Sequence, residues 1–377
     1  MEECNLSIEI NLKSKKFCCS FSIKEKLTFI RGDSGVGKTE FTRRVSSRTS
    51  ANHIDVSNGF ELSVLTTEVF ENIYRKALSQ KNKDESTKNQ EETKFLRKFW
   101  STNDNFPFSD NMIFIIDDDD FVKTHAFAVL FECDKSNYYI IINRSNLPSL
   151  SYSADEVYNF VSDGINHTLE KYYSYMKKTI DTHLDMILVE GIGSDFIFFQ
   201  TLFSNGKVLK PNDFNGIHGG GKDNLIKALK ENIILFYHKS IFLIIDFCGF
   251  GSNIEDLINL AKDYNVTLFV NRDYLSFEYF LLKSNLIKDD IDDFIEKNRL
   301  KFYSLEDLCT QRLIFLTRGT LYPYSKSNNS FSSCYYLDCC SNINNNGNCD
   351  IRRSKLAKDK VKNMIIDTDF EYFLSCI

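Results

Sequence analysis

A glycine-rich segment near the N-terminus constrains this chain more than any other feature. Residues 32–39 read Gly-Asp-Ser-Gly-Val-Gly-Lys-Thr, which matches the pattern G-x4-G-K-T. The mainly apolar run Leu27–Arg31 predicts a strand before the segment, and we expect a helix after it, from Thr39 to about Ser46. A strand, a glycine turn and a helix in this order are the setting in which the pattern forms a phosphate-binding loop (P-loop).

Each residue type in this segment suits a part of a bound nucleoside triphosphate. Glycines let backbone N–H groups face a phosphate without interference from Cβ. Lys38 supplies a positive charge to the β- and γ-phosphates, and the Thr39 hydroxyl is a ligand for Mg²⁺. We therefore expect ATP and Mg²⁺ as cofactors. The expected cofactor-binding residues are Gly32, Asp33, Ser34, Gly35, Val36, Gly37, Lys38, Thr39 and Asn143.

Two further strands are expected to complete this site. Met112–Ile116 is fully apolar and runs into four aspartates, Asp117–Asp120. An acid in this place holds the hydration shell of Mg²⁺, so Asp117 is the expected metal residue and Asp118 the expected catalytic residue that polarises water. A buried strand that ends in a solvated acidic loop is the alternative, and the sequence does not decide which aspartate has which role.

The next predicted strand, Tyr138–Ile142, ends at Asn143. We expect Asn143 to sense the γ-phosphate. Arg144 either contacts phosphate or is a surface charge. The two short segments 6–12 and 17–23 predict a hairpin ahead of the glycine-rich segment, joined by the polar turn 13–16.

A second α/β pattern begins near residue 185. Strands alternate with helices there, which favours a parallel sheet. The expected elements are strand Met186–Val189, helix Asp195–Phe203, a glycine turn at 219–221, helix Lys222–Lys230, strand Ile241–Ile245, helix Ile254–Tyr264 and strand Val266–Val270. The predicted organisation is an α/β P-loop NTPase domain at 1–150, a helical connector at 151–184, a parallel α/β domain at 185–310 and a Cys/Asn-rich segment at 311–377.

The second pattern resembles the Toprim domains of topoisomerases, primases and OLD nucleases. The segment 186–203 ends an apolar strand in Glu190-Gly191 and opens a helix at Asp195. The segment 241–251 is similar to the strand that carries the family's Asp-x-Asp, here Asp246-Phe247-Cys248, so Cys248 replaces the second acid. The segment 272–282 supplies Glu278 as the matching late glutamate.

The resemblance implies a second Mg²⁺ site with nuclease chemistry. Its metal residues would be Glu190, Asp195, Asp246 and Glu278, with Glu190 and Asp246 catalytic and DNA or RNA as substrate. Carboxylates at the carboxyl ends of parallel strands converge on the metal, which activates water. Three interpretations stay open: an ATP-regulated, Mg²⁺-dependent nucleic-acid enzyme with OLD-like logic, a nucleotide-binding switch whose degenerate Toprim-like domain binds a partner, and strand-end acids that bind nothing.

Two broader likenesses concern the whole chain. The hairpin before the glycine-rich segment resembles the start of ABC-type ATPase domains, although no LSGGQ-like signature lies between Thr39 and Asp117. The combination of RGDSGVGKT, NYYIIINRSNLPSLSYS, DFCGFG and FEYFLLKSN resembles uncharacterised P-loop proteins of phages and mobile elements in low-GC bacteria. That likeness supplies no established reaction. Phage defence or the maintenance of mobile elements is the role expected for the ATP-regulated nucleic-acid enzyme, the first of the three interpretations.

Composition excludes some classes of protein. The formal net charge is −6, so no strongly basic nucleic-acid surface is expected over the whole chain. The first four residues carry two acids and form no signal peptide, and the longest apolar run, Ile241–Ile245, is far shorter than the ~20 residues of a membrane helix. We expect a cytoplasmic protein with no membrane partner, and a homo-oligomer stays open. A cysteine cluster at 334–349 predicts either reduced thiols or a zinc site.

Overall fold

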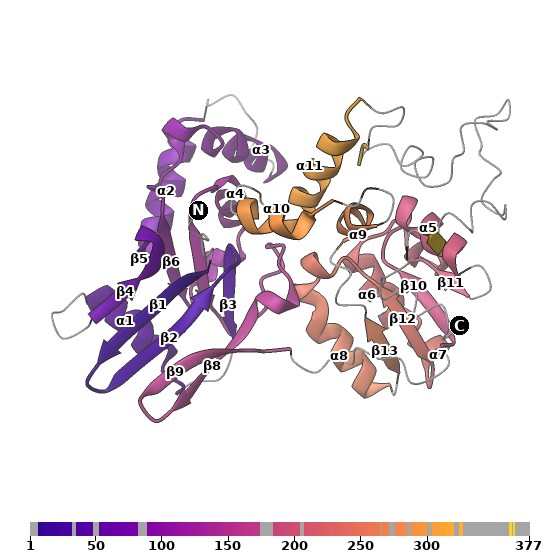
Figure 1. Ribbon diagram of the computed structural model, residues 1–377, viewed down its shortest axis with the longest axis horizontal. Helices are drawn as coiled ribbons and strands as arrows, with labels where there is room; N and C mark the ends of the chain where they lie inside the picture. Colours follow the sequence, from indigo (N-terminus) through magenta and orange to yellow (C-terminus); the bar gives the residue numbers. More distant parts are fainter. Residues whose placement is uncertain are drawn as a thin grey trace. The chain divides into compact units, whose positions relative to one another are not determined.

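The computed structural model divides the chain into two compact units (Figure 1). Unit 1 comprises Met1–Ser174 and Glu296–Ser304, and unit 2 comprises Tyr175–Ile295 and Leu305–Ile377. The described residues are 7–31, 35–47, 53–81, 89–173, 184–203, 207–264, 266–270, 276–284, 287, 289–299, 302, 304–319, 324–326, 362–363 and 365.

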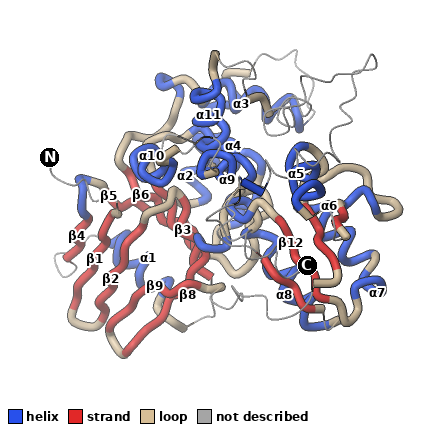
Figure 2. Tube along the Cα trace, turned by 45° about the vertical axis from the view of Figure 1, so that its right-hand side comes forward, coloured by secondary structure: helices blue, strands red, loops and turns tan. Residues whose placement is uncertain are grey.

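Within the described residues, unit 1 is built on one large sheet, which Figure 2 shows as a continuous red layer. The strand order is β4-β1-β2-β9-β8-β3-β7-β6-β5. The half from β3 to β5 is parallel, whereas the pairs β1–β2, β1–β4 and β8–β9 are antiparallel. Its strands are β1 Ile8–Ser14, β2 Phe17–Ile23, β3 Leu27–Arg31, β4 His53–Val56, β5 Glu61–Val64, β6 Met112–Asp117, β7 Tyr138–Ile142, β8 Val157–Asp163 and β9 Asn166–Lys171.

The central strands are buried because both of their faces are covered. Every residue of β3 and of β7 is buried, as expected for strands inside a parallel sheet. On one face, Ile140 belongs to the same core cluster as Phe41 of α1 (Lys38–Ser47). On the other face, Tyr139 packs against Phe131 of α4 (His125–Cys133), with ring centroids 5.1 Å apart. The sheet therefore lies between helices.

The helices of unit 1 connect these strands. Thr66 and Thr124 cap α2 and α4 by accepting hydrogen bonds from the backbone N–H groups of Val69 and Phe127, which satisfies donors that a helix start leaves open. The single tryptophan of the chain, Trp100, ends α3 and is buried. The helices are α1 Lys38–Ser47, α2 Thr67–Ser79, α3 Asn89–Trp100 and α4 His125–Cys133.

Unit 2 is built on a smaller sheet whose described strands are all parallel, in the order β11-β10-β12-β13. The strands are β10 Met186–Val189, β11 Val208–Leu209, β12 Ser240–Ile244 and β13 Thr267–Val270. The helices are α5 Ser194–Leu202, α6 Lys222–Glu231, α7 Ile233–Phe236, α8 Ile254–Asp263, α9 Phe277–Lys283, α10 Ile291–Asn298 and α11 Leu305–Thr317, of which α10 runs from unit 2 into the unit 1 segment.

The predicted α/β class is confirmed, and several predicted strands match β6, β7, β10 and β12 to within one residue. The helical connector predicted at 151–184 is wrong for residues 157–171, which form the antiparallel pair β8–β9. Gly164, with φ +65°, turns the chain between the two strands. Residues 174–183 lie outside the described residues, and α11 runs across the predicted boundary at 311.

Candidate functional site

The glycine-rich loop lies between β3 and α1. Gly32, Asp33 and Ser34 lie outside the described residues. Gly35 and Gly37 have φ values of +96° and +95°, which side chains other than glycine rarely adopt. α1 begins at Lys38, and the Phe41 N–H closes a helical turn by donating to the Gly37 carbonyl at 2.9 Å. The loop therefore leads directly into the first turn of a helix. The N–H groups of this turn that have no partner within the helix, together with the helix dipole, favour the binding of an anion there.

A cavity of about 300 Å³ opens beside this loop. It brings together residues from the loop, from the start of α1 and from the ends of β6 and β7. Its lining consists of Gly35, Gly37, Lys38, Thr39, Glu40, Asp117, Asp118, Ile142, Asn143 and Arg144. Residues predicted from three separate segments thus share one cavity, because β3, β7 and β6 are neighbours in the sheet. Val36 does not line it, and Glu40 and Ile142 were not predicted.

The two aspartates lie where β6 leaves the sheet. Burial raises the pKa of Asp117, and the neighbouring carboxylate of Asp118 adds to this. A side-chain hydrogen bond with Thr42 and the charge of Lys38 act in the opposite direction. Asp118 has φ 54°, a left-handed conformation that aspartate tolerates, and its N–H donates to the Ile142 carbonyl at 2.8 Å. The cavity wall therefore presents carboxylates within the field of the Lys38 ammonium.

The end of β7, which neighbours β6 in the sheet, supplies another part of the cavity lining. Asn143 is buried, and its N–H donates to the Ile30 carbonyl at 3.2 Å, which ties it to β3. Its Oδ1 accepts from the Ser145 N–H at 3.0 Å and from the Ser145 hydroxyl at 2.9 Å. This arrangement fixes the side chain of Asn143 and leaves its amide NH₂ as the group able to donate to a ligand.

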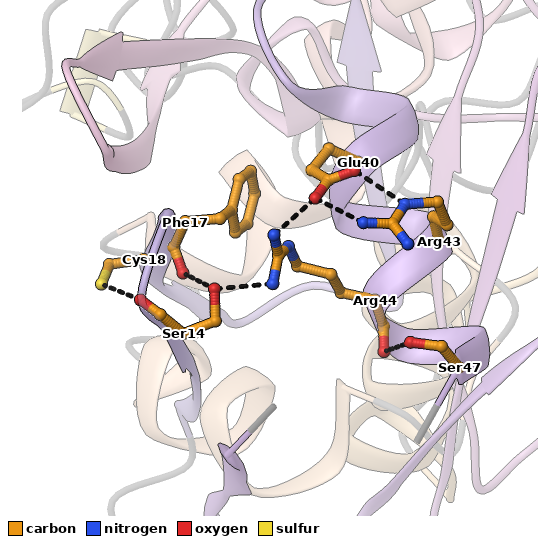
Figure 3. A network of polar contacts seen from close by, with 7 residues as sticks. All are labelled: Ser14, Phe17, Cys18, Glu40, Arg43, Arg44 and Ser47. Carbon is orange, nitrogen blue, oxygen red and sulfur yellow. Dashed lines mark hydrogen bonds and ion pairs between the residues drawn. The ribbon is translucent and has the colours of Figure 1, made fainter. Parts of the chain in front are cut away.

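Glu40 links the cavity to the first hairpin through a polar network (Figure 3). Its carboxylate accepts from Arg43 at 2.7 and 2.8 Å and pairs with Arg44 at 2.6 Å. Arg44 also donates to the Ser14 hydroxyl at 2.6 Å. The hydrogen bond from Arg43 is the main cause of a Glu40 pKa lowered to about 2, so this carboxylate stays ionised at neutral pH. The signal for this network in the sequence is the E-x2-R-R spacing within one helix.

In unit 2, Glu190 and Asp246 lie side by side at the carboxyl ends of β10 and β12. The two strands pair in parallel, with Val189 opposite Ile244. The Asp246 N–H donates to Glu190 Oε2 at 2.9 Å, and the Glu190 N–H donates to the Ile244 carbonyl at 2.9 Å. Ligands of open α/β sheets bind at this edge.

Asp195 joins this edge from the start of α5. A Cβ placed on Gly191 would lie 1.7 Å from Asp195 Oδ2, so a larger residue at position 191 would displace the Asp195 carboxylate. The predicted glycine turn also packs here, because the Gly221 N–H donates to the Glu190 carbonyl at 3.1 Å. The backbone of the Glu190-Gly191 pair and the backbone of the glycine turn at 219–221 therefore lie close to each other.

The acids of unit 2 repel one another. Burial raises the pKa of Glu190 to about 7, with Asp195 and Glu306 adding to the shift, while the Asp246 backbone N–H and Lys222 oppose it. Burial and the charge of Glu190 raise the pKa of Asp246 well above its usual range. Within the described residues, however, no three histidine, cysteine or acidic side chains are arranged to hold a metal ion together.

One hydroxyl group and one ammonium group contact acids of unit 2, and both belong to residues that the sequence analysis did not single out. Tyr324 donates its hydroxyl to Glu278 Oε1 at 2.6 Å. Lys326 forms an ion pair with Glu306 of α11. Glu278 itself is buried in the first turn of α9. The long sequence separation of these partners explains why no motif found them. The cysteine cluster at 334–349 lies outside the described residues.

A comparison with known protein families and with curated protein sequences finds no match to this chain. In the part of the chain that the structure describes, no helix has both the length and the apolar character needed to cross a membrane.

Proposed function

We propose that unit 1 binds ATP together with Mg²⁺ in the cavity beside the glycine-rich loop. One observation carries the proposal: Lys38, Thr39 and Asp117 line the same cavity, next to glycines with positive φ. An ammonium, a hydroxyl and a carboxylate in this arrangement suit a phosphate chain and its metal ion. A volume of about 300 Å³ is at the lower end of the range for ligand pockets.

The residues divide into three roles under this proposal. The loop N–H groups and Lys38 bind the β- and γ-phosphates. Thr39 and Asp117 hold Mg²⁺, which neutralises phosphate charge. Asp118 orients the attacking water, and Asn143 and Arg144 contact the γ-phosphate from the end of β7. A bound cation also relieves the repulsion between Asp117 and Asp118.

Calorimetric titration with ATP and Mg²⁺ tests this proposal. Lys38→Ala should weaken binding on the order of 100-fold, because a charged hydrogen bond contributes about 1.5–3 kcal/mol and 1.4 kcal/mol is tenfold. Lys24→Ala is the matched control, since Lys24 is exposed at the end of β2 and does not line the cavity. Equal affinity in Lys38→Ala and the native protein would refute the assignment.

A second candidate function concerns unit 2, which we propose binds a divalent cation and processes DNA or RNA. The favouring observation is the direct contact of Glu190 with the Asp246 backbone at the carboxyl edge of a parallel sheet, with Asp195 beside them. A cation would offset the mutual repulsion of these acids. Binding would require Asp195 and Glu278 to move toward the Glu190–Asp246 pair, given that the described acids form no ready metal site.

Mn²⁺ titration of the native protein and of Glu190→Gln separates the alternatives. Mn²⁺ binding that Glu190→Gln abolishes, with cleavage of duplex DNA, single-stranded DNA or RNA, supports the enzyme. Mn²⁺ binding without cleavage of any of the three supports a nucleotide-dependent switch that acts through a partner, with Cys248 in place of a second acid. No Mn²⁺ binding outside the ATP cavity contradicts both forms of this candidate.

A further inference from the structure

The four aspartates that follow the apolar part of β6 have different surroundings in the structure. Asp117 and Asp118 line the cavity, whereas Asp119 and Asp120 do not. Asp120 is exposed and forms an ion pair with Lys123 at 2.7 Å, within the same short turn. An exposed pair of this kind contributes little to stability. Asp119, which is partly buried, belongs to neither group.

The side chain of Asp119 contacts a helix that is distant in the sequence. Thr67, the first residue of α2, donates its hydroxyl to Asp119 Oδ1 at 2.8 Å. Asp119 also stands directly before the short helical turn Asp120–Lys123, a position at which aspartate commonly caps a helix. Its side chain makes no capping hydrogen bond there. The carboxylate is therefore directed at α2 and not at its own turn.

Two further contacts fix α2 against the segments on either side of the acidic run. The Leu65 N–H, just before α2, donates to the Ile115 carbonyl of β6 at 2.9 Å. The buried rings of Phe70 and Phe121 stack with centroids 4.6 Å apart. The start of α2 thus packs on β6 ahead of the acidic run and on the turn behind it. The hydroxyl of Thr67 lies on a framework that does not depend on it.

The residue between the cavity and this contact has an unusual backbone conformation. Asp118 has φ 54°, and its N–H donates to the Ile142 carbonyl of β7 at 2.8 Å. A left-handed conformation outside glycine persists where the surrounding structure holds it. The acidic run is attached to β7 at Asp118 and to α2 at Asp119. The contact with α2 therefore restrains the peptide that follows Asp118.

We propose that Asp119 is a positioning residue for the nucleotide site. Through its hydrogen bond with Thr67 it holds the acidic run in the conformation that brings the Asp118 carboxylate to the cavity. The inference rests on the proposed binding of ATP and Mg²⁺ in unit 1. The carboxylates of Asp117 and Asp118 then act together on the metal ion, since Coulomb attraction weakens with distance. This makes α2 a part of the site, although no residue of α2 lines the cavity.

Two substitutions at position 67 separate the hydrogen bond from the packing of α2. Thr67→Val keeps the shape of the side chain and removes the hydroxyl, whereas Thr67→Ser keeps the hydroxyl. Thr66 caps α2 by accepting from the Val69 N–H, so neither substitution removes the cap. Thr168→Val, at an exposed position of β9 that does not line the cavity, is the matched control.

Hydrogen–deuterium exchange of the ligand-free protein measures the restraint itself. The amides of residues 117–119 should exchange about threefold faster in Thr67→Val than in the native protein, a factor that suits the loss of one exposed hydrogen bond. Thr67→Ser and Thr168→Val should match the native protein. Equal exchange in Thr67→Val and Thr67→Ser would overturn the inference, because the hydrogen bond would then not hold the acidic run.

Calorimetric titration with ATP, with and without Mg²⁺, measures the consequence for the site. The gain in ATP affinity that Mg²⁺ provides should fall about threefold in Thr67→Val and return in Thr67→Ser, while ATP affinity without Mg²⁺ stays the same. Faster exchange with an unchanged Mg²⁺ gain would contradict the inference, since the restraint would not orient a metal residue. Faster exchange in Thr67→Val, in a protein that binds no ATP in its native form, would support the contact and reject the proposed function of unit 1.

Discussion

The guanidinium of Arg31 donates a hydrogen bond to the backbone carbonyl of Arg144, at a distance of 3.1 Å. Arg31 ends β3 immediately before the glycine-rich loop, and Arg144 lines the cavity just beyond β7. A second hydrogen bond, to the Tyr173 hydroxyl at 3.1 Å, orients the guanidinium, and the Tyr172 ring lies 5.1 Å from it. This buried cation therefore sets the position of the cavity wall relative to the loop.

Arg31→Lys should reduce the preference for ATP over ADP about fivefold while ADP affinity changes little. A lysine ammonium cannot reproduce the planar fork that bonds two partners at once, so Arg144 loses its fixed position at the cavity and with it the proposed contact to the γ-phosphate. Calorimetric titrations with ATP and with ADP measure the ratio. Arg75→Lys, at an exposed position of α2, is the control. An unchanged ratio of ATP affinity to ADP affinity in Arg31→Lys would show that Arg144 does not recognise the γ-phosphate.

Asp117→Asn should remove the part of ATP-dependent stabilisation that requires Mg²⁺. A ligand that binds only the folded state raises its stability, and the amide of asparagine is a poorer Mg²⁺ ligand than a carboxylate. The fluorescence of Trp100, the single tryptophan, reports the unfolding of unit 1. Unfolding midpoints with ATP, with and without Mg²⁺, give the difference. A Mg²⁺ response that survives in Asp117→Asn would place the metal residue elsewhere, with Asp118 the next to test.

The elements that the sequence predicted well are those with an unambiguous local pattern. Met112–Ile116 of β6 and all of β7 are continuous apolar runs because both faces of a central parallel strand are buried. The sequence predicted a helix for residues 157–171 because aromatic and branched side chains occur there at spacings that fit both a helix and a strand. In the structure these residues form strands, since they pair with β2 and β3. Glu40 was missed although it lies beside Thr39, since the motif pattern stops at Thr39.

Other parts of the site depend on contacts that no local pattern encodes. Glu306, Tyr324 and Lys326 approach the acids of unit 2 only through the packing of α9, α11 and the segment after α11. His167 meets Gly37 because β9 inserts beside β2, far from its position in the sequence. A motif can therefore predict the residues of a binding loop but not the residues that pack against it.

Lys26 should make the stability of unit 1 rise with pH between about 7 and 9. Its side chain is buried and donates to the Phe131 and Asp134 carbonyls, the latter at 2.6 Å. Burial lowers its pKa from 10.5 to about 7, against the opposing charge of Asp134. Between these values the unfolded chain binds more protons than the folded one, so stability increases as pH rises and is level below pH 7.

The free energy of unfolding should therefore grow by up to about 2 kcal/mol from pH 7 to pH 9, since one pH unit is worth about 1.4 kcal/mol. Denaturant unfolding followed by Trp100 fluorescence measures it. Lys26→Met should flatten this dependence, whereas Lys24→Met, at an exposed position of the same turn, should keep it. The same slope in both variants would assign the pH dependence to other groups.

Lys326 brings an ammonium group to the acids of unit 2. It pairs with Glu306, and its pKa is raised because the charges of Glu278, Glu306 and Asp246 outweigh the effect of burial. An ammonium in this position offsets part of the repulsion between the acids and competes with any divalent cation. Lys326→Met should therefore strengthen Mn²⁺ binding about fivefold.

Three comparisons make this prediction specific. Lys227→Met removes an exposed charge from α6, which should leave Mn²⁺ affinity unchanged. Tyr324→Phe removes the hydrogen bond to Glu278 without changing charge, and should strengthen Mn²⁺ binding less than Lys326→Met. Glu190→Gln in the Lys326→Met background should abolish the gain, because the cation would lose the carboxylate next to Asp246. If Lys326→Met binds Mn²⁺ no better than the native protein, the ammonium and the metal do not share a site. The charges of the acids in unit 2 would then be offset by bound protons and by Lys326 alone.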